Sequence, residues 1–136
     1  MITGFYAGLL ALIFVALSFN VILRRVKGKQ LFGDNNDPVM TRAIRAHGNF
    51  IEYVPYILLM LFLYENFGGS RYVVHAFGIT LIIARALHIW GLIWEKVAGR
   101  LSGTVLTQLL LVMLAVMLIV KGIKYMFLVT GPMGVN

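Results

Sequence analysis

The stretch Arg42-Ala-Ile-Arg-Ala-His-Gly-Asn-Phe-Ile-Glu-Tyr-Val-Pro55 places charged and polar side chains at the start of an otherwise apolar segment. On a helix, which turns by about 100° per residue, these side chains share a face roughly 100° wide, and only His47 points away from it. The residues on this face are Arg42, Arg45, Asn49, Glu52, Tyr53 and Tyr56. Because charged groups are costly in lipid, a polar stripe inside a membrane helix indicates a functional site.

The composition of the chain is that of an integral membrane protein. It has 136 residues, of which 60% are hydrophobic, and a mean hydropathy of +0.89, which is too apolar for a soluble domain. Four apolar stretches predict helices at about 2–23, 39–67, 72–95 and 104–129, each long enough to cross roughly 30 Å of hydrocarbon. The predicted fold class is therefore all-α, an integral membrane four-helix bundle formed by a single domain over residues 1–136.

The formal net charge of +7 follows from basic residues at helix ends and in loops. A membrane explains that distribution, with lipid headgroups as partners, so no nucleic-acid partner is expected. Most of the bases lie in or beside the first loop, and Lys96 and Arg100 lie in the third. By the positive-inside rule both loops face the cytoplasm and both termini lie outside. The compact loops suggest a bacterial inner membrane.

Polar side chains on the other three predicted helices lie at the depth of this stripe. Arg85 and His88 share one face of the third predicted helix, with Arg85 about 15 Å from its cytoplasmic end. The first and fourth helices contribute Asn20, Arg24, Thr107 and Gln108. An arginine at this depth costs roughly 2.5–3.5 kcal/mol unless it is paired or faces water, and Glu52 is its expected partner.

Two interpretations of these charges remain open. In the first, Glu52 forms a structural ion pair with Arg85 or Arg45, and the other bases bind headgroups. In the second, the stripe is one wall of a cytoplasm-facing pocket for an anionic polar ligand. Arginines bind carboxylates in bidentate fashion, Asn49 hydrogen-bonds amides, and Glu52 pairs with an ammonium group. A ligand that carries all three groups is a small peptide.

The chain contains no cysteine. Disulfides, thiolate metal sites and a sulfur nucleophile of the protein are therefore excluded, and any thiol chemistry must use the sulfur of a substrate. No acidic or histidine cluster has the spacing of metal ligands, so no metal is expected.

The run Arg42-x-x-Arg45-Ala-x-x-Asn49-x-x-Glu52-Tyr53-x-Pro55 resembles the second-helix signature of the MAPEG family, the membrane-associated proteins of eicosanoid and glutathione metabolism. Chain length, four spans and a basic first loop agree with this family along nearly the whole sequence. The resemblance implies a homotrimer of four-helix subunits, with glutathione bound between adjacent subunits near the cytoplasmic side. The implied glutathione-binding residues are Arg45, Asn49, Glu52, Tyr53 and Arg85, with Arg42, His47 and His88 as further candidates.

Candidates for catalysis follow from the same resemblance. Arg24 or Arg25 resembles an arginine pair that the leukotriene-forming synthase places near its active site. Arg100 aligns one residue away from the arginine that stabilises the thiolate. Two positions depart from the family pattern, since His88 and Leu92 stand where the eukaryotic synthases have tyrosines that contact glutathione.

The resemblance implies a membrane-bound glutathione-dependent transferase or peroxidase that acts on small apolar electrophiles from the bilayer. An arginine beside the glutathione sulfur would lower the pKa of the thiol, and the thiolate would attack the electrophile. A decrease of about two units, worth roughly 2.7 kcal/mol, makes the thiolate the main form at neutral pH. The alternative is a non-catalytic membrane protein that binds lipid or partners, or a small transporter, in which the charges form a structural network.

Overall fold

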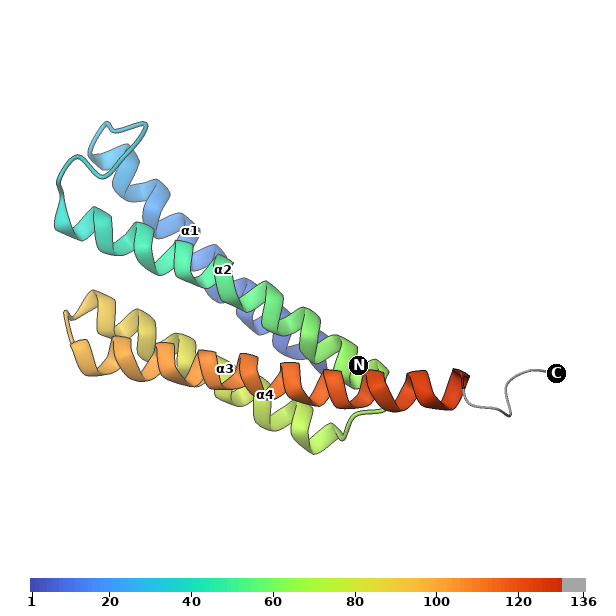
Figure 1. The fold of residues 1–136 in the computed structure, drawn as a ribbon. Coiled ribbons are helices and arrows are strands. Elements are labelled where there is room, and N and C mark those ends of the chain that lie inside the picture. The colour runs from blue at the N-terminus through green and yellow to red at the C-terminus, as the bar shows by residue number, and fades with distance from the viewer. Residues whose placement is uncertain (131–136) are drawn as a thin grey trace.

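The computed structural model describes residues 1–130, which form four long helices joined by short connections (Figure 1). The helices are α1 (Ile2–Lys27), α2 (Pro38–Asn66), α3 (Arg71–Ile93) and α4 (Val97–Thr130). All four are long and apolar enough to cross a membrane. The described part of the chain contains no strand. The structure thus confirms an all-helical, multi-pass membrane fold.

Two helix ends differ from the hydropathy pattern. Helix α1 continues to Lys27, four residues past the predicted end at 23, and α4 begins at Val97 rather than at 104. Charged residues mark the edge of the hydrocarbon, but they do not end a helix. The helix ranges predicted from hydropathy were therefore too short at these two ends. Only three residues connect α3 to α4, and this tight turn places Glu95 in the left-handed region at φ +55°.

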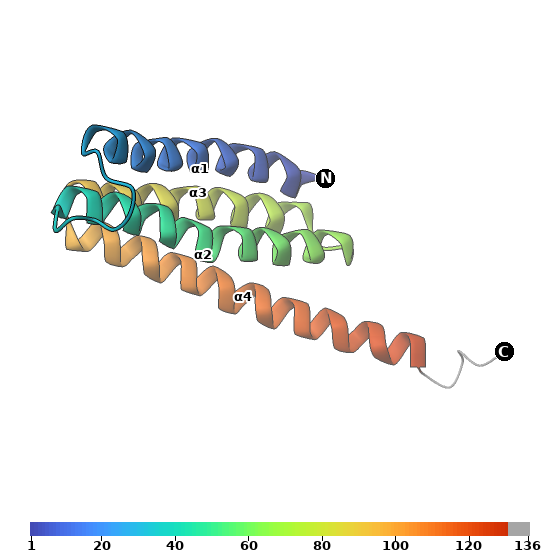
Figure 2. The ribbon, with the colours of Figure 1, turned by 90° about the horizontal axis from the view of Figure 1, so that it is seen from above.

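The helices form two hairpins, α1–α2 and α3–α4, which diverge toward one end of the bundle (Figure 1). The α1–α2 and α3–α4 connections both lie at that end (Figure 2). Side chains from all four helices build the core that joins the hairpins. Its most deeply buried members are Leu10, Ile57, Leu61, Val74, Leu81 and Leu114, each at most 1% exposed. Beyond this core, side chains of α2, α3 and α4 line a cavity.

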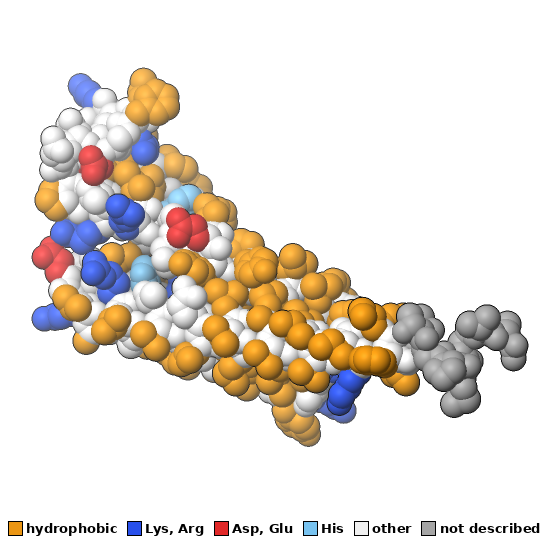
Figure 3. Space-filling model, viewed as in Figure 1, with side chains coloured by type: hydrophobic (Ala, Val, Ile, Leu, Met, Phe, Trp, Pro, Cys, Tyr) orange, Lys and Arg blue, Asp and Glu red, His pale blue; other side chains and the backbone are white. Residues whose placement is uncertain are grey.

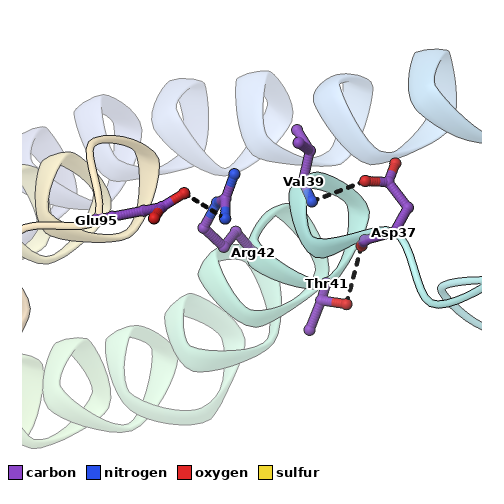
Figure 4. A network of polar contacts seen from close by, with 5 residues as sticks. All are labelled: Asp37, Val39, Thr41, Arg42 and Glu95. Atoms are coloured by element: carbon purple, nitrogen blue, oxygen red, sulfur yellow. Dashed lines mark hydrogen bonds and ion pairs between the residues drawn. The ribbon is translucent and has the colours of Figure 1, made fainter.

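Helix α2 begins at an N-cap aspartate followed by a proline. The Asp37 carboxylate accepts a hydrogen bond from the Val39 backbone N–H at 2.9 Å, and Pro38 occupies the first helical position (Figure 4). From the first turn of α2, the Thr41 hydroxyl donates to the carboxylate of Asp34 in the preceding loop at 2.6 Å, which lowers the pKa of that carboxyl. These bonds fix where the polar face of α2 starts.

A glutamate from α2 caps the start of α1. The Glu65 carboxylate accepts hydrogen bonds from the Ile2 N–H at 2.6 Å, the Thr3 N–H at 2.9 Å and the Thr3 hydroxyl at 2.7 Å. Met1 supplies no side-chain cap of its own. A negative charge at a helix N-terminus also interacts favourably with the helix dipole. Glu65 therefore joins α1 to α2 at the end opposite the divergence.

Replacing Glu65 with Gln should destabilise the bundle, because one amide oxygen replaces a charged acceptor of three hydrogen bonds. We expect a loss of about 1–2 kcal/mol, seen as a lower midpoint of thermal unfolding in detergent. Glu95→Gln is the matched control, since it removes an ion pair with Arg42 whose side chains are 28% and 66% exposed. Such a pair contributes less than about 1 kcal/mol. Equal midpoints for Glu65→Gln and the wild type would contradict the capping role.

Candidate functional site

An open cavity of about 670 Å³ lies between α2, α3 and α4 at the divergent end of the bundle. Its lining residues are Thr41, Arg42, Ile44, Arg45, Gly48, Asn49 and Glu52 of α2, His88 and Leu92 of α3, and Arg100 and Thr104 of α4. Figure 3 shows charged and histidine side chains gathered at this end, while hydrophobic side chains cover most of the remaining face. The volume is typical of a site for a small molecule.

The polar face of α2 supplies one wall of this cavity. Arg42, Arg45, Asn49 and Glu52 follow one another at spacings of three or four residues, and all four line the cavity. This arrangement confirms that their side chains share one face. Tyr53 lies farther along the same helix, where it is half-buried against the hydrophobic core rather than in the cavity lining.

His47 points away from the cavity, as the helical periodicity predicts. A hydrogen bond of 3.0 Å joins its Nε2 to the Ser18 hydroxyl of α1, and its ring stacks on Phe14 with centroids 5.2 Å apart. His47 thus packs between α1 and α2 and is not part of the cavity lining.

The expected ion pair between Glu52 and either Arg85 or Arg45 is wrong. The one ion pair among residues 1–130 joins Arg42 Nη1 to Glu95 Oε1 at 2.6 Å, and it links α2 to the turn after α3 (Figure 4). Glu52 is exposed at the cavity wall and Arg85 is buried behind it, which keeps the two charges apart. Among the described residues, Glu52 and Arg45 have no ion-pair partner and remain available to a ligand.

Arg85 is 1% exposed, and its hydrogen-bond partners are all uncharged. Its Nη1 donates to Asn49 Oδ1 at 2.7 Å, while Nη2 donates to the Gly103 carbonyl at 3.3 Å and to the Thr107 hydroxyl. Arg85 is not part of the cavity lining, because Asn49 lies between them. The structure places Arg85 inside the bundle, and the ion pair that the sequence predicted for it with Glu52 is wrong.

The three arginines predicted for catalysis lie in different places. Arg100 lines the cavity from the first turns of α4, a position the sequence assigned to a loop. The Arg24 Nε donates to Asn20 Oδ1 at 2.9 Å, and Arg24 borders a separate cavity of about 60 Å³ between α1, α2 and α3. Arg25 donates from Nη1 to the Leu31 carbonyl at 2.7 Å, in the first loop. Of the three, Arg100 alone lines the main cavity.

Four lining residues were not singled out in the sequence: Thr41, Ile44, Gly48 and Thr104. Thr104 follows Arg100 by four residues, a spacing that brings both to one face of α4. This shared face was missed in the sequence because the start of α4 was predicted seven residues too late, at 104 instead of 97.

The chemistry of the cavity suits a zwitterionic ligand with excess negative charge. Its lining carries three guanidinium groups, one carboxylate, an amide, a hydroxyl from each of two threonines and one imidazole. Guanidinium groups bind carboxylates in a bidentate geometry, and a carboxylate binds an ammonium group. Within residues 1–130, no group of three or more His, Asp or Glu side chains gathers as a metal site would require.

The fold and this cavity define a multi-pass membrane protein with a cavity lined by basic side chains at one end of its bundle. The model of the MAPEG family matches residues 3–120, and the chain belongs to that family. This result confirms the resemblance seen in α2. The chain is accordingly a membrane protein of the family associated with glutathione and eicosanoid metabolism.

A curated relative supports the same assignment. The inner membrane protein YecN of Escherichia coli K12 is 38% identical over 118 residues, which cover 85% of this chain and 89% of the relative. The YecN protein of Escherichia coli O6:H1 matches with the same identity and the same coverage.

The contact between α3 and α4 behind the cavity should require glycine at position 103. A Cβ there would lie 2.6 Å from the Ala84 carbonyl oxygen and 2.6 Å from the His88 backbone nitrogen, neither of which can move independently. We expect Gly103→Ala to cost about 2–3 kcal/mol and to lower the thermal midpoint in detergent. Gly122→Ala, with no atom within 4 Å of its added Cβ, should be neutral or stabilising by up to about 1 kcal/mol. Equal effects of the two variants would refute the close approach.

Proposed function

We propose that this chain is a membrane-bound glutathione-dependent transferase or peroxidase that acts on small apolar electrophiles. The observation that supports it most directly is the set of charges in the cavity lining. Arg45 and Arg100, which have no ion-pair partner among the described residues, occur there with a single carboxylate, that of Glu52. Glutathione carries two carboxylates, one ammonium group and two amides, so its charges and hydrogen-bonding groups complement this lining.

In this proposal, Arg100 lowers the pKa of the bound thiol. A guanidinium beside sulfur favours the thiolate, which is the nucleophilic form. In the transferase reaction the thiolate attacks an electrophilic carbon, an S–C bond forms, and the leaving group departs with the bonding electrons. In the peroxidase reaction the thiolate attacks the terminal hydroperoxide oxygen, an S–O bond forms and the O–O bond breaks, which gives glutathione sulfenic acid. The alkoxide that leaves takes up the proton released from the thiol and becomes an alcohol. A second glutathione then converts the sulfenic acid to the disulfide and releases water.

The membrane context gives this chemistry its substrates. The cavity lies at the polar end of four helices whose outer faces are apolar, so electrophiles dissolved in the bilayer would reach it laterally. We propose an inner-membrane location with the first and third loops in the cytoplasm, where glutathione is the soluble partner. We also propose a homotrimer, in which an adjacent copy covers the open side of the cavity and contributes Arg24 or Arg25.

Glutathione binding should depend on Arg45 and Glu52. We expect Arg45→Ala and Glu52→Gln each to weaken binding by about 10- to 100-fold in calorimetry with detergent-purified protein, because each removes a charged hydrogen bond to the ligand. Arg71→Ala, an exposed arginine at the far end of α3, is the control with unchanged affinity.

The same variants separate the proposal from a structural charge network. A network predicts that Glu52→Gln lowers the thermal midpoint without glutathione, whereas a ligand site predicts an unchanged midpoint and a smaller shift when glutathione is added. Absence of saturable binding by the wild type would exclude the proposed function.

Thiol activation should depend on Arg100. Mixing the wild-type protein with glutathione at neutral pH should produce thiolate absorbance in the ultraviolet, because the guanidinium stabilises the anion. Arg100→Ala should abolish most of that absorbance, whereas Arg100→Lys should keep part of it. Full thiolate absorbance in Arg100→Ala would assign the role to another cation, with Arg24 and Arg25 as the next to replace.

A further inference from the structure

The contact between Arg85 and Asn49 determines which atoms of Asn49 face the cavity. We infer that Arg85 is a positioning residue that never touches the ligand and acts through Asn49 to make this wall select an oxygen acceptor, such as a carboxylate or carbonyl group. This inference rests on the proposed function and assigns a specificity determinant within that site.

The geometry of Arg85 separates it from the cavity. Its side chain is 1% exposed and lies behind the cavity wall. Asn49 contacts both the cavity and Arg85, since it lines the cavity and its Oδ1 accepts a hydrogen bond from Arg85 Nη1 at 2.7 Å. Nη2 is engaged by Gly103 and Thr107 on α4. Asn49 is thus the path by which the buried guanidinium can influence a ligand.

The chemistry of the two groups dictates the orientation of the amide. A guanidinium only donates hydrogen bonds, whereas an asparagine amide has one accepting oxygen and one NH₂ group that donates two. The bond to Arg85 therefore requires Oδ1 to point toward α3. The NH₂ group is then directed to the other side of the amide, toward the cavity, and Arg85 prevents the flip that would present an acceptor instead.

The side chains that line the cavity near Asn49 also donate hydrogen bonds. Arg45 precedes it by one turn of α2, and Arg100 and Thr104 line the cavity from α4. Arginine side chains supply only donors, and a threonine hydroxyl can donate as well. With the Asn49 NH₂ group among them, this wall is a cluster of donors that suits a carboxylate or carbonyl oxygen. The carboxylate of Glu52, one turn farther along α2, is left for the ammonium group of the same ligand.

Stability alone would favour a different residue at position 49. A buried arginine is strongly destabilising without a partner, and a carboxylate in hydrogen-bond reach would neutralise it. Aspartate has nearly the shape of asparagine and would pair with Arg85. It would, however, remove both amide donors at position 49 and leave only carboxylate acceptors at that point of the wall. The Asn49→Asp substitution therefore separates a structural role of the contact from a role in ligand selection.

The test compares the binding of glutathione to four forms of the full chain in detergent, by calorimetry, with the thermal midpoint measured for each. Asn49→Asp should fold with a midpoint at or above that of the wild type, yet bind glutathione about 30-fold or more weakly. Arg85→Gln keeps a donor for Asn49 Oδ1 and should bind within about fivefold of the wild type. Arg85→Met provides no donor and should lose about 10- to 30-fold.

A second ligand adds a measurement that a structural role would not change. Glutathione diethyl ester lacks both carboxylates, so the wild type should prefer glutathione, and this preference should shrink in Asn49→Asp and Arg85→Met but not in Arg85→Gln. Wild-type affinity in Asn49→Asp would overturn the positioning role while leaving the proposed function intact, and this holds even if Arg85→Met does not fold. A wild type that fails to bind glutathione would overturn both.

Discussion

The guanidinium of Arg85 must be hydrogen-bonded inside an apolar bundle, and the arrangement of three helices depends on that requirement. Its partners are Asn49 on α2 and both Gly103 and Thr107 on α4. Arg85 itself lies on α3, so one side chain sets the relative position of all three elements that surround the cavity. Because a charged group without partners is so costly in this environment, alternative registers of these helices are strongly disfavoured.

The two ends of the bundle differ in how their side chains can pack. The apolar core holds the two hairpins together at one end, where the Glu65 cap also joins α1 to α2 within the first hairpin. At the other end, the charged side chains of α2 and α4 stay hydrated and cannot pack against one another as the core residues do. The hairpins diverge there, and the Arg42–Glu95 ion pair spans α2 and the α3–α4 turn. The cavity exists because the residues that could bind a ligand also prevent close packing.

Local patterns in the sequence were sufficient for the four spans and for the polar wall on α2. Hydropathy over about 20 residues and a 3.6-residue period are properties of single helices, and the positions of Arg42, Arg45, Asn49 and Glu52 in the cavity follow from them. The beginning of α4 was predicted wrongly, since a polar segment beside the membrane can be either loop or helix. The pairing of Glu52 with Arg85 failed for a different reason, because depth in the membrane does not specify which way two side chains on separate helices point.

The sequence by itself determined the membrane class, the helix order, the cavity-facing side of α2 and the resemblance to the MAPEG family, since each of these is encoded in local composition or spacing. Only the tertiary structure decided that Arg85 lies behind Asn49 rather than in the cavity. It also decided that Arg42 forms its ion pair with Glu95, and that Arg100 lines the cavity from α4. These contacts join residues far apart in the chain. They depend on how closely the backbones approach, as they do at Gly103, and on side-chain directions that only the packed bundle defines.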